Sequence, residues 1–156
     1  MAARCSKCYF LLVVHADYVT VQPMSKQILL LRHGKAELEP VHHDFDRPLA
    51  RRGREDVTQL AGWLKQSAID CDQLYYSAAK RTSETFEALN AVWQSPRRYE
   101  PCETMYLASP GDLLSLLQTL DEAASSVMLI GHNPGLHQLA LTLARPCTRP
   151  AFEELE

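Results

Sequence analysis

The feature that most constrains the fold is an apolar run, residues 28–31, that ends abruptly in Arg32-His33-Gly34. Four apolar residues without alternation are typical of a strand buried on both faces, as in a parallel sheet covered by helices. The carboxyl end of such a strand is where open α/β sheets bind their ligands. Gly34 allows the chain to turn sharply or to approach a ligand closely at this point. Because three-residue motifs also recur by chance, a strand followed by an ordinary polar loop is the alternative interpretation.

Apolar patterns along the rest of the chain predict strands that alternate with helices. The expected strands cover 27–31, 72–77 and 127–130, with a short one within 101–107 after a connector over 95–101. The expected helices cover 51–66, the segment that follows 77–81, the segment that starts near Ser109-Pro110, and 136–143. This order is β-α-β-α-(β)-α-β-α. It predicts an α/β fold, a three-layer α/β/α sandwich with a mainly parallel sheet and right-handed crossovers.

The length of 156 residues is enough for one domain with one core. Because Met24-Ser25-Lys26 directly precedes the first expected strand, we expect residues 1–23 to be a poorly ordered N-terminal appendage and 24–156 to be the domain. The apolar run 9–14 is short for the core of a signal sequence. No apolar run approaches the length of a membrane span, so no membrane partner is expected.

Charge and cysteine content exclude several classes of protein. The formal net charge of −3 gives no overall basic field, so nucleic acid is not an expected partner. The five cysteines are odd in number in a chain that is not small, which favours a reducing compartment and a cytoplasmic location over a disulfide framework. Cys5-x-x-Cys8 has no second pair at zinc-site spacing, so incidental thiols are the preferred interpretation.

Three predicted strand ends carry the residues that suggest chemistry. These are Arg32-His33-Gly34, the segment from Ser77 to Arg81, and Gly131-His132-Asn133. In a parallel sheet they meet at one edge, where two arginines and two histidines with no matching carboxylate favour a tetrahedral anion such as phosphate. A neutral histidine can attack the phosphorus, and a second can stabilise the developing charge. The sequence contains no P-loop, no dinucleotide-binding glycine pattern and no recognisable serine-hydrolase motif.

The polar segment 37–47 contains His42, His43, Asp44 and Asp46. Neighbouring side chains rarely converge on one metal ion, so we interpret these four residues as exposed side chains of a surface loop.

Four motifs in this order resemble the histidine phosphatase superfamily and, within it, the small SixA-type phosphohistidine phosphatases. They are Leu-Leu-Leu-Arg-His-Gly-Lys-Ala-Glu, Arg-Pro-Leu followed by Arg-Gly, Ser-x-x-x-Arg-Thr-x-x-Thr, and Ile-Gly-His-Asn-Pro-Gly. The resemblance covers about residues 27–144. It implies a phosphoglycerate mutase-like fold and a reaction through a phosphorylated histidine.

The resemblance also implies roles for individual residues. His33 matches the nucleophile that becomes phosphorylated, Arg32 and Arg81 match the phosphate-binding arginines, and His132 matches the second histidine at the phosphoryl group. It implies no metal and no other cofactor, because the arginines and histidines supply the charge stabilisation.

Further site residues follow from the same resemblance. Arg47 matches a basic residue near the pocket, and we expect Gly34 and Asn133 to contact the substrate as well. Glu103 lies where larger members place a general acid, with an ordinary exposed glutamate as the alternative.

The chain departs from the family pattern at three places. Ser77-Ala78 replaces the usual Ser-Pro, residues 1–23 have no family counterpart, and the chain stops at Glu156 where relatives continue with one or two strands. We therefore expect a C-terminally truncated or alternative form with an exposed sheet edge.

The expected function is a metal-independent phosphatase that acts on protein phosphohistidine. The interval between His33 and His132 is filled by expected core elements, which leaves no room for a large lid and favours a protein side chain as the substrate. A phosphatase of small phosphate esters and a non-catalytic phosphate-binding module are the alternatives. The expected partner is accordingly a phosphorylated protein or a small phosphate ester, and the protein is expected to be a monomer.

Overall fold

A computed structural model of the chain describes residues 11–17, 25–38, 43–120 and 123–144. Within these residues, the sheet has five strands in the order β1-β2-β5-β3-β4. The strands are β1 (Leu11–Asp17), β2 (Ser25–Arg32), β3 (Gln73–Ser77), β4 (Arg98–Cys102) and β5 (Ser126–Gly131). The α-helices are α1 (Arg51–Gln66), α2 (Lys80–Trp93), α3 (Pro110–Gln118) and α4 (Gly135–Leu143), and the short 3₁₀ helices are η1 (Asp44–Asp46) and η2 (Glu103–Met105).

The sheet is mainly parallel, as predicted. Strand β5 pairs in parallel with β2 on one side and with β3 on the other, and β3 pairs in parallel with β4. Only β1 runs antiparallel to its neighbour β2 among the pairs that the structure describes. The three strands β2, β5 and β3 are therefore adjacent, and their carboxyl ends lie at one edge of the sheet.

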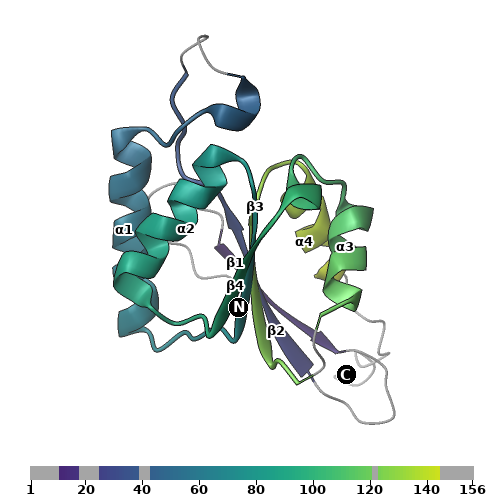
Figure 1. Cartoon of the computed structure of the whole chain (residues 1–156). Coiled ribbons are helices and arrows are strands. Elements are labelled where there is room, and N and C mark those ends of the chain that lie inside the picture. Colours follow the sequence, from purple (N-terminus) through teal and green to yellow (C-terminus); the bar gives the residue numbers. More distant parts are fainter. Residues whose placement is uncertain (1–10, 18–24, 39–42, 121–122, 145–156) are drawn as a thin grey trace, which may run out of the picture.

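Helices cover both faces of the sheet, which confirms the three-layer α/β fold. Figure 1 shows α1 and α2 on one side of the strands and α3 and α4 on the other. Leu29 and Leu31 of β2 pack with the buried residues of α1 and α2, whereas Ile28 and Leu30 pack with those of α3 and α4. The unbroken apolar run in β2 thus reflects burial on both faces, since successive side chains of a strand point in opposite directions.

Two strands differ from the expectation from the sequence. The strand expected within 101–107 is β4, which begins at Arg98 and gives way to η2 at Glu103. The expected bounds were wrong because β4 is an edge strand whose first four residues are exposed, so it lacks the apolar run on which the prediction depends.

Strand β1 was not predicted, and it lies within residues 1–23, the segment expected to be an appendage. The division of the chain at residue 24 stays a prediction. Residues 145–156, on which the expectation of a truncated C-terminus depends, lie outside the described residues.

The structure also bears on membrane spans and on the cysteines. In the part of the chain that the structure describes, no helix is long and apolar enough to cross a membrane. Cys71 and Cys102 are free thiols, whereas Cys5, Cys8 and Cys147 lie outside the described residues.

Candidate active site at the carboxyl ends of three strands

The structure brings His33, Arg81 and His132 together at the edge where β2, β3 and β5 end. His33 directly follows β2, His132 directly follows β5, and Arg81 lies in the first turn of α2, four residues beyond β3. The two imidazole rings are 5.2 Å apart between centroids. The guanidinium of Arg81 reaches both of them, with Nε 3.3 Å from Nε2 of His33 and Nη2 3.3 Å from Nδ1 of His132.

The hydrogen bonds of His33 leave the lone pair of its Nε2 directed at Arg81. Nδ1 lies 2.7 Å from the carbonyl oxygen of Gly34, which can only accept, so we assign the ring proton to Nδ1. Burial lowers the pKa of His33 from 6.5 to about 4. The neighbouring arginine charges also lower this pKa, whereas the hydrogen bond to Gly34 raises it. His33 is therefore a neutral imidazole with a nucleophilic Nε2 at physiological pH.

His132 has the opposite tautomer. Arg81 can only donate, so the Nδ1 of His132 accepts, and its Nε2–H donates to the Oγ of Ser77 at 2.9 Å. Ser77 is fully buried at the end of β3, and this contact fixes the plane of the His132 ring. Burial and the charge of Arg81 lower the pKa of His132 to about 3. An anion bound beside Nδ1 would favour its protonation and make it a hydrogen-bond donor.

The loop after β2 is held close to α1 and α2. The amide of Gly34 donates to Oγ1 of Thr85 at 3.0 Å, and this hydroxyl donates to the carbonyl of Arg81 at 2.6 Å. A Cβ on Gly34 would lie 3.0 Å from both the Gly53 carbonyl and a methyl group of Val57. The glycine therefore permits close packing of the loop that carries His33.

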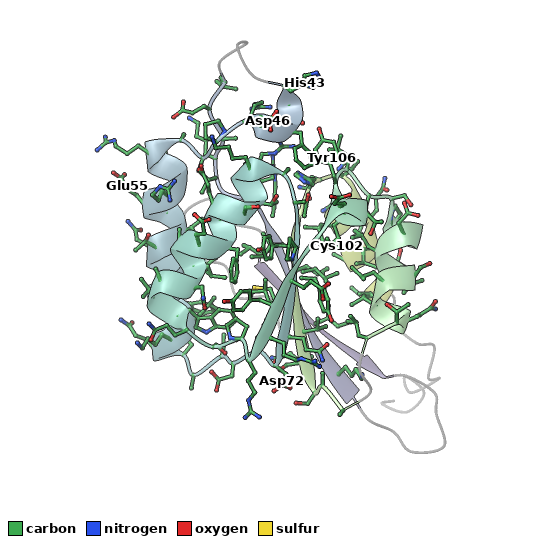
Figure 2. The ribbon with its side chains drawn as sticks, viewed as in Figure 1. His43, Asp46, Glu55, Asp72, Cys102 and Tyr106 are labelled. Carbon is green, nitrogen blue, oxygen red and sulfur yellow. The ribbon has the colours of Figure 1, made fainter. Side chains whose placement is uncertain are left out.

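Asp44 places a carboxylate at the site, which corrects one prediction. Its Oδ2 accepts from Arg81 Nη2 at 3.0 Å and from the Tyr106 hydroxyl at 2.8 Å, and its Oδ1 accepts from Arg47 Nη1 at 2.8 Å. The expectation of no matching carboxylate is wrong. The side chain of Asp44 is exposed, as predicted, but it also binds Arg81, Arg47 and Tyr106. Figure 2 shows η1 above Tyr106, which directly follows η2; Asp46 of η1 and the preceding His43 are labelled.

An open cavity of about 670 Å³ lies beside His33 and Arg81. Its walls include five cations and one acid, and they also contain His33, Gly34 and Asn133. The cations are Arg32, Lys35, Arg47, Arg52 and Arg81, and the acid is Asp56. The chain is acidic overall, so this excess of positive charge is local and suits an anionic ligand.

The other predicted residues fall into two groups. Arg32, Gly34, Arg47 and Asn133 line the same cavity as His33, and their contact with a substrate stays a prediction. Glu103 has an exposed side chain at the start of η2, and its role as a general acid stays a prediction.

Comparisons with known proteins identify the family. Residues 28–102 match the model of the histidine phosphatase superfamily (branch 1). The SixA protein of Agrobacterium tumefaciens has a similar structure, with a TM-score of 0.69 and 30% sequence identity over 74% of each chain. The chain belongs to the histidine phosphatase superfamily. A structure of the protein histidine phosphatase SixA complexed with tungstate is also similar, with a TM-score of 0.70 and 27% identity over 81% of each chain.

A curated relative of this histidine phosphatase has no described function. The uncharacterized protein Rv1276c of Mycobacterium tuberculosis is 30% identical over 114 residues, which are 73% of this chain and 70% of the relative.

Ser77 and Tyr106 also lie at the site, although the sequence suggested no individual role for either of them. Ser77 binds His132, and the N-cap position of α2 is taken by Ala79. The position of Ser77 in the Ser-x-x-x-Arg motif was the available signal. Tyr106 had none, because its contact with Asp44 joins residues 62 positions apart.

No group of three or more metal-ligating side chains exists within the described ranges. The expectation of metal independence stays a prediction.

Proposed function

We propose that this histidine phosphatase removes phosphate from protein phosphohistidine, without a metal, through a phosphorylated His33. The single observation that carries the proposal is the neutral Nε2 of His33, which faces the guanidinium of Arg81 beside His132. A nucleophile and two groups that can stabilise a phosphoryl group thus lie next to one another.

The reaction would proceed in two displacements at phosphorus. In the first, the lone pair of His33 Nε2 forms a bond to phosphorus while the bond from phosphorus to the substrate nitrogen breaks, and that nitrogen keeps the electron pair. In the second, water attacks the phosphorus of phosphorylated His33, Nε2 leaves, and inorganic phosphate is released. Arg81 would donate to the phosphoryl oxygens in both steps, and His132 would donate once protonated.

The ionised state of Asp44 favours a phosphoramidate substrate over a phosphate ester. Hydrogen bonds from Tyr106 and Arg47, with a contribution from Arg81, lower the pKa of Asp44 to about 2, so Asp44 has no proton to give at neutral pH. The imidazole of phosphohistidine leaves as a neutral group once its ring is protonated by solvent, whereas an ester oxygen needs a proton from an acid. The open cavity also suits a side chain presented on the surface of a protein.

The test measures transfer of ³²P from a labelled phosphohistidine protein. We expect acid-labile label on wild-type protein and on the control His137→Ala, which removes an exposed imidazole from α4, and none on His33→Ala. Label on His33→Ala at the wild-type level would exclude His33 as the nucleophile. Rapid hydrolysis of p-nitrophenyl phosphate without turnover of the phosphoprotein would assign the enzyme to small phosphate esters instead.

A further inference from the structure

Arg81 uses two different edges of its guanidinium group. The edge formed by Nε and Nη2 faces the two histidines, with 3.3 Å to Nε2 of His33 and 3.3 Å to Nδ1 of His132. The edge formed by Nη1 and Nη2 binds Asp44, through its carbonyl oxygen from Nη1 and through Oδ2 from Nη2 at 3.0 Å. Because the guanidinium is planar and its N–H groups form a rigid fork, whatever holds one edge also orients the other.

Asp44 is itself held from several directions. Arg47 donates to its Oδ1 at 2.8 Å, and the Tyr106 hydroxyl donates to its Oδ2 at 2.8 Å. The neighbouring Phe45 packs edge-on against the Tyr106 ring, with centroids 5.0 Å apart. The segment η1 is thus fixed to η2, and Asp44 joins the two arginines Arg47 and Arg81.

The burial of Arg81 explains why such a partner is needed. The side chain of Arg81 is only 4% exposed, whereas that of Asp44 is 47% exposed. A buried guanidinium with unpaired N–H groups is costly, so it would turn toward other acceptors if Asp44 were absent. Asp44 is bound to the edge that points away from the histidines, and it therefore does not compete with a phosphoryl group for the edge beside His33.

We propose that Asp44 is a positioning residue for the phosphoryl-transfer reaction. It binds the Nη1 and Nη2 edge of Arg81, so that the Nε and Nη2 edge is presented to two oxygens of the phosphoryl group on His33. The inference rests on the proposed function for the identity of that group. It assigns to η1 a part in the reaction that its sequence does not suggest.

The test compares Asp44→Ala and Asp44→Asn with Asp46→Asn. Asp46 lies in the same helix η1 with an exposed side chain, so its replacement removes the same charge two residues away. A displaced catalytic group costs on the order of 10²-fold in rate, so we expect that loss in kcat for Asp44→Ala, with a much smaller change in KM. We expect a smaller loss for Asp44→Asn, whose amide oxygen can still accept, and no change beyond twofold for Asp46→Asn.

A second measurement separates positioning from general stability. The ¹H–¹⁵N signal of Arg81 Nε, assigned with Arg81→Lys, reports the contact with His33 directly. We expect it to shift or broaden in Asp44→Ala and to stay in place in Asp46→Asn. The affinity for orthovanadate should fall across the variants in the same order as kcat.

The variant Tyr106→Phe removes one hydrogen bond to Asp44. It should lower kcat by a smaller factor than Asp44→Ala, so it tests the proposal even if Asp44→Ala does not fold.

Unchanged kcat and an unchanged Arg81 Nε signal in folded Asp44→Ala or Asp44→Asn would overturn the proposal, and so would an equal loss in Asp46→Asn. If wild-type protein released no phosphate from any donor, the proposed function would fail instead. The Arg81 signal and the affinity for orthovanadate would still decide whether Asp44 orients the guanidinium.

Discussion

Single residues at this site owe their chemistry to their surroundings. His33 lies between the Gly34 carbonyl and the Arg81 guanidinium, so its proton is held on Nδ1 and its Nε2 stays available. His132 is held in the other tautomer by Ser77. The two imidazoles therefore differ in the nitrogen that carries the proton, and a different role is open to each.

The first prediction concerns the protonation of His33. Its pKa of about 4 means that the imidazole is still neutral at pH 5.5, where a histidine of ordinary pKa near 6.5 is mostly charged. An NMR titration of wild-type protein without phosphate should therefore show no change in the His33 ring signals between pH 7 and pH 5.5. A midpoint near 6.5 would contradict the buried, arginine-flanked environment.

The second prediction concerns Ser77. Replacing it with Ala leaves the Nε2–H of His132 without its acceptor in a buried setting, which costs roughly 1–3 kcal/mol of stability. Because the ring is no longer fixed, we expect a lower kcat as well, with less effect from Ser77→Thr, which keeps the hydroxyl. Thermal unfolding and steady-state kinetics on the three proteins measure this, and full activity of Ser77→Ala would show that the serine does not orient His132.

At the scale of elements, the packing of α1 against the loop after β2 determines where His33 lies. Gly53 of α1 approaches Lys35 so closely that a Cβ would lie 2.2 Å from the Lys35 carbonyl oxygen. The amide of Ala50 donates to the same carbonyl at 2.8 Å. The start of α1 and the loop therefore form one rigid unit.

The third prediction compares two glycines of the same helix. Gly53→Ala should destabilise the protein by about 1–3 kcal/mol and lower activity, because the added methyl group displaces the backbone at Lys35. Gly62→Ala should stabilise it by about 0.8–1 kcal/mol, since nothing lies within 4 Å of its Cβ and alanine is the better helix former. Urea unfolding of both variants checks the opposite signs, and equal shifts would show that helix propensity alone decides both.

The elements that the sequence predicted well are those with a strong apolar pattern. The helix expected over 51–66 is α1. The ends of β2 and β5 lie within two residues of the ends expected from their buried apolar runs. Strand β4 and the contact of η1 with the site could not be predicted in this way. Asp44 and Arg81 are 37 positions apart, and a local apolar pattern cannot predict a contact at that separation.

Over the whole molecule, the site depends on three chain segments that meet only in the folded sheet. His33, Arg81 and His132 follow three neighbouring strands, so the sheet order determines their distances. The gathering of these residues could be predicted from the parallel topology. Their tautomers and the part of Asp44 could not, because they depend on hydrogen bonds across the assembled fold.

The fourth prediction concerns stability and pH. His33 and His132 have lowered pKa values in the folded state, so the unfolded chain binds more protons between pH 6.5 and about 4. Stability should therefore fall as pH falls through this window, by on the order of 1 kcal/mol per pH unit for each histidine. Urea unfolding at pH 7, 6 and 5 measures the slope, and the double variant His33→Asn, His132→Asn should flatten it. An unchanged slope in that variant would place the pH dependence in other groups.

The central position of β5 has a consequence for how the protein is made. Residues 126–131 leave the ribosome after β2, β3 and β4, yet β5 lies between β2 and β3 and hydrogen-bonds to both. A nascent chain that has emerged only as far as α3 therefore lacks the strand that joins the β1–β2 pair to the β3–β4 pair. The complete sheet can form only late in translation, once β5 has emerged.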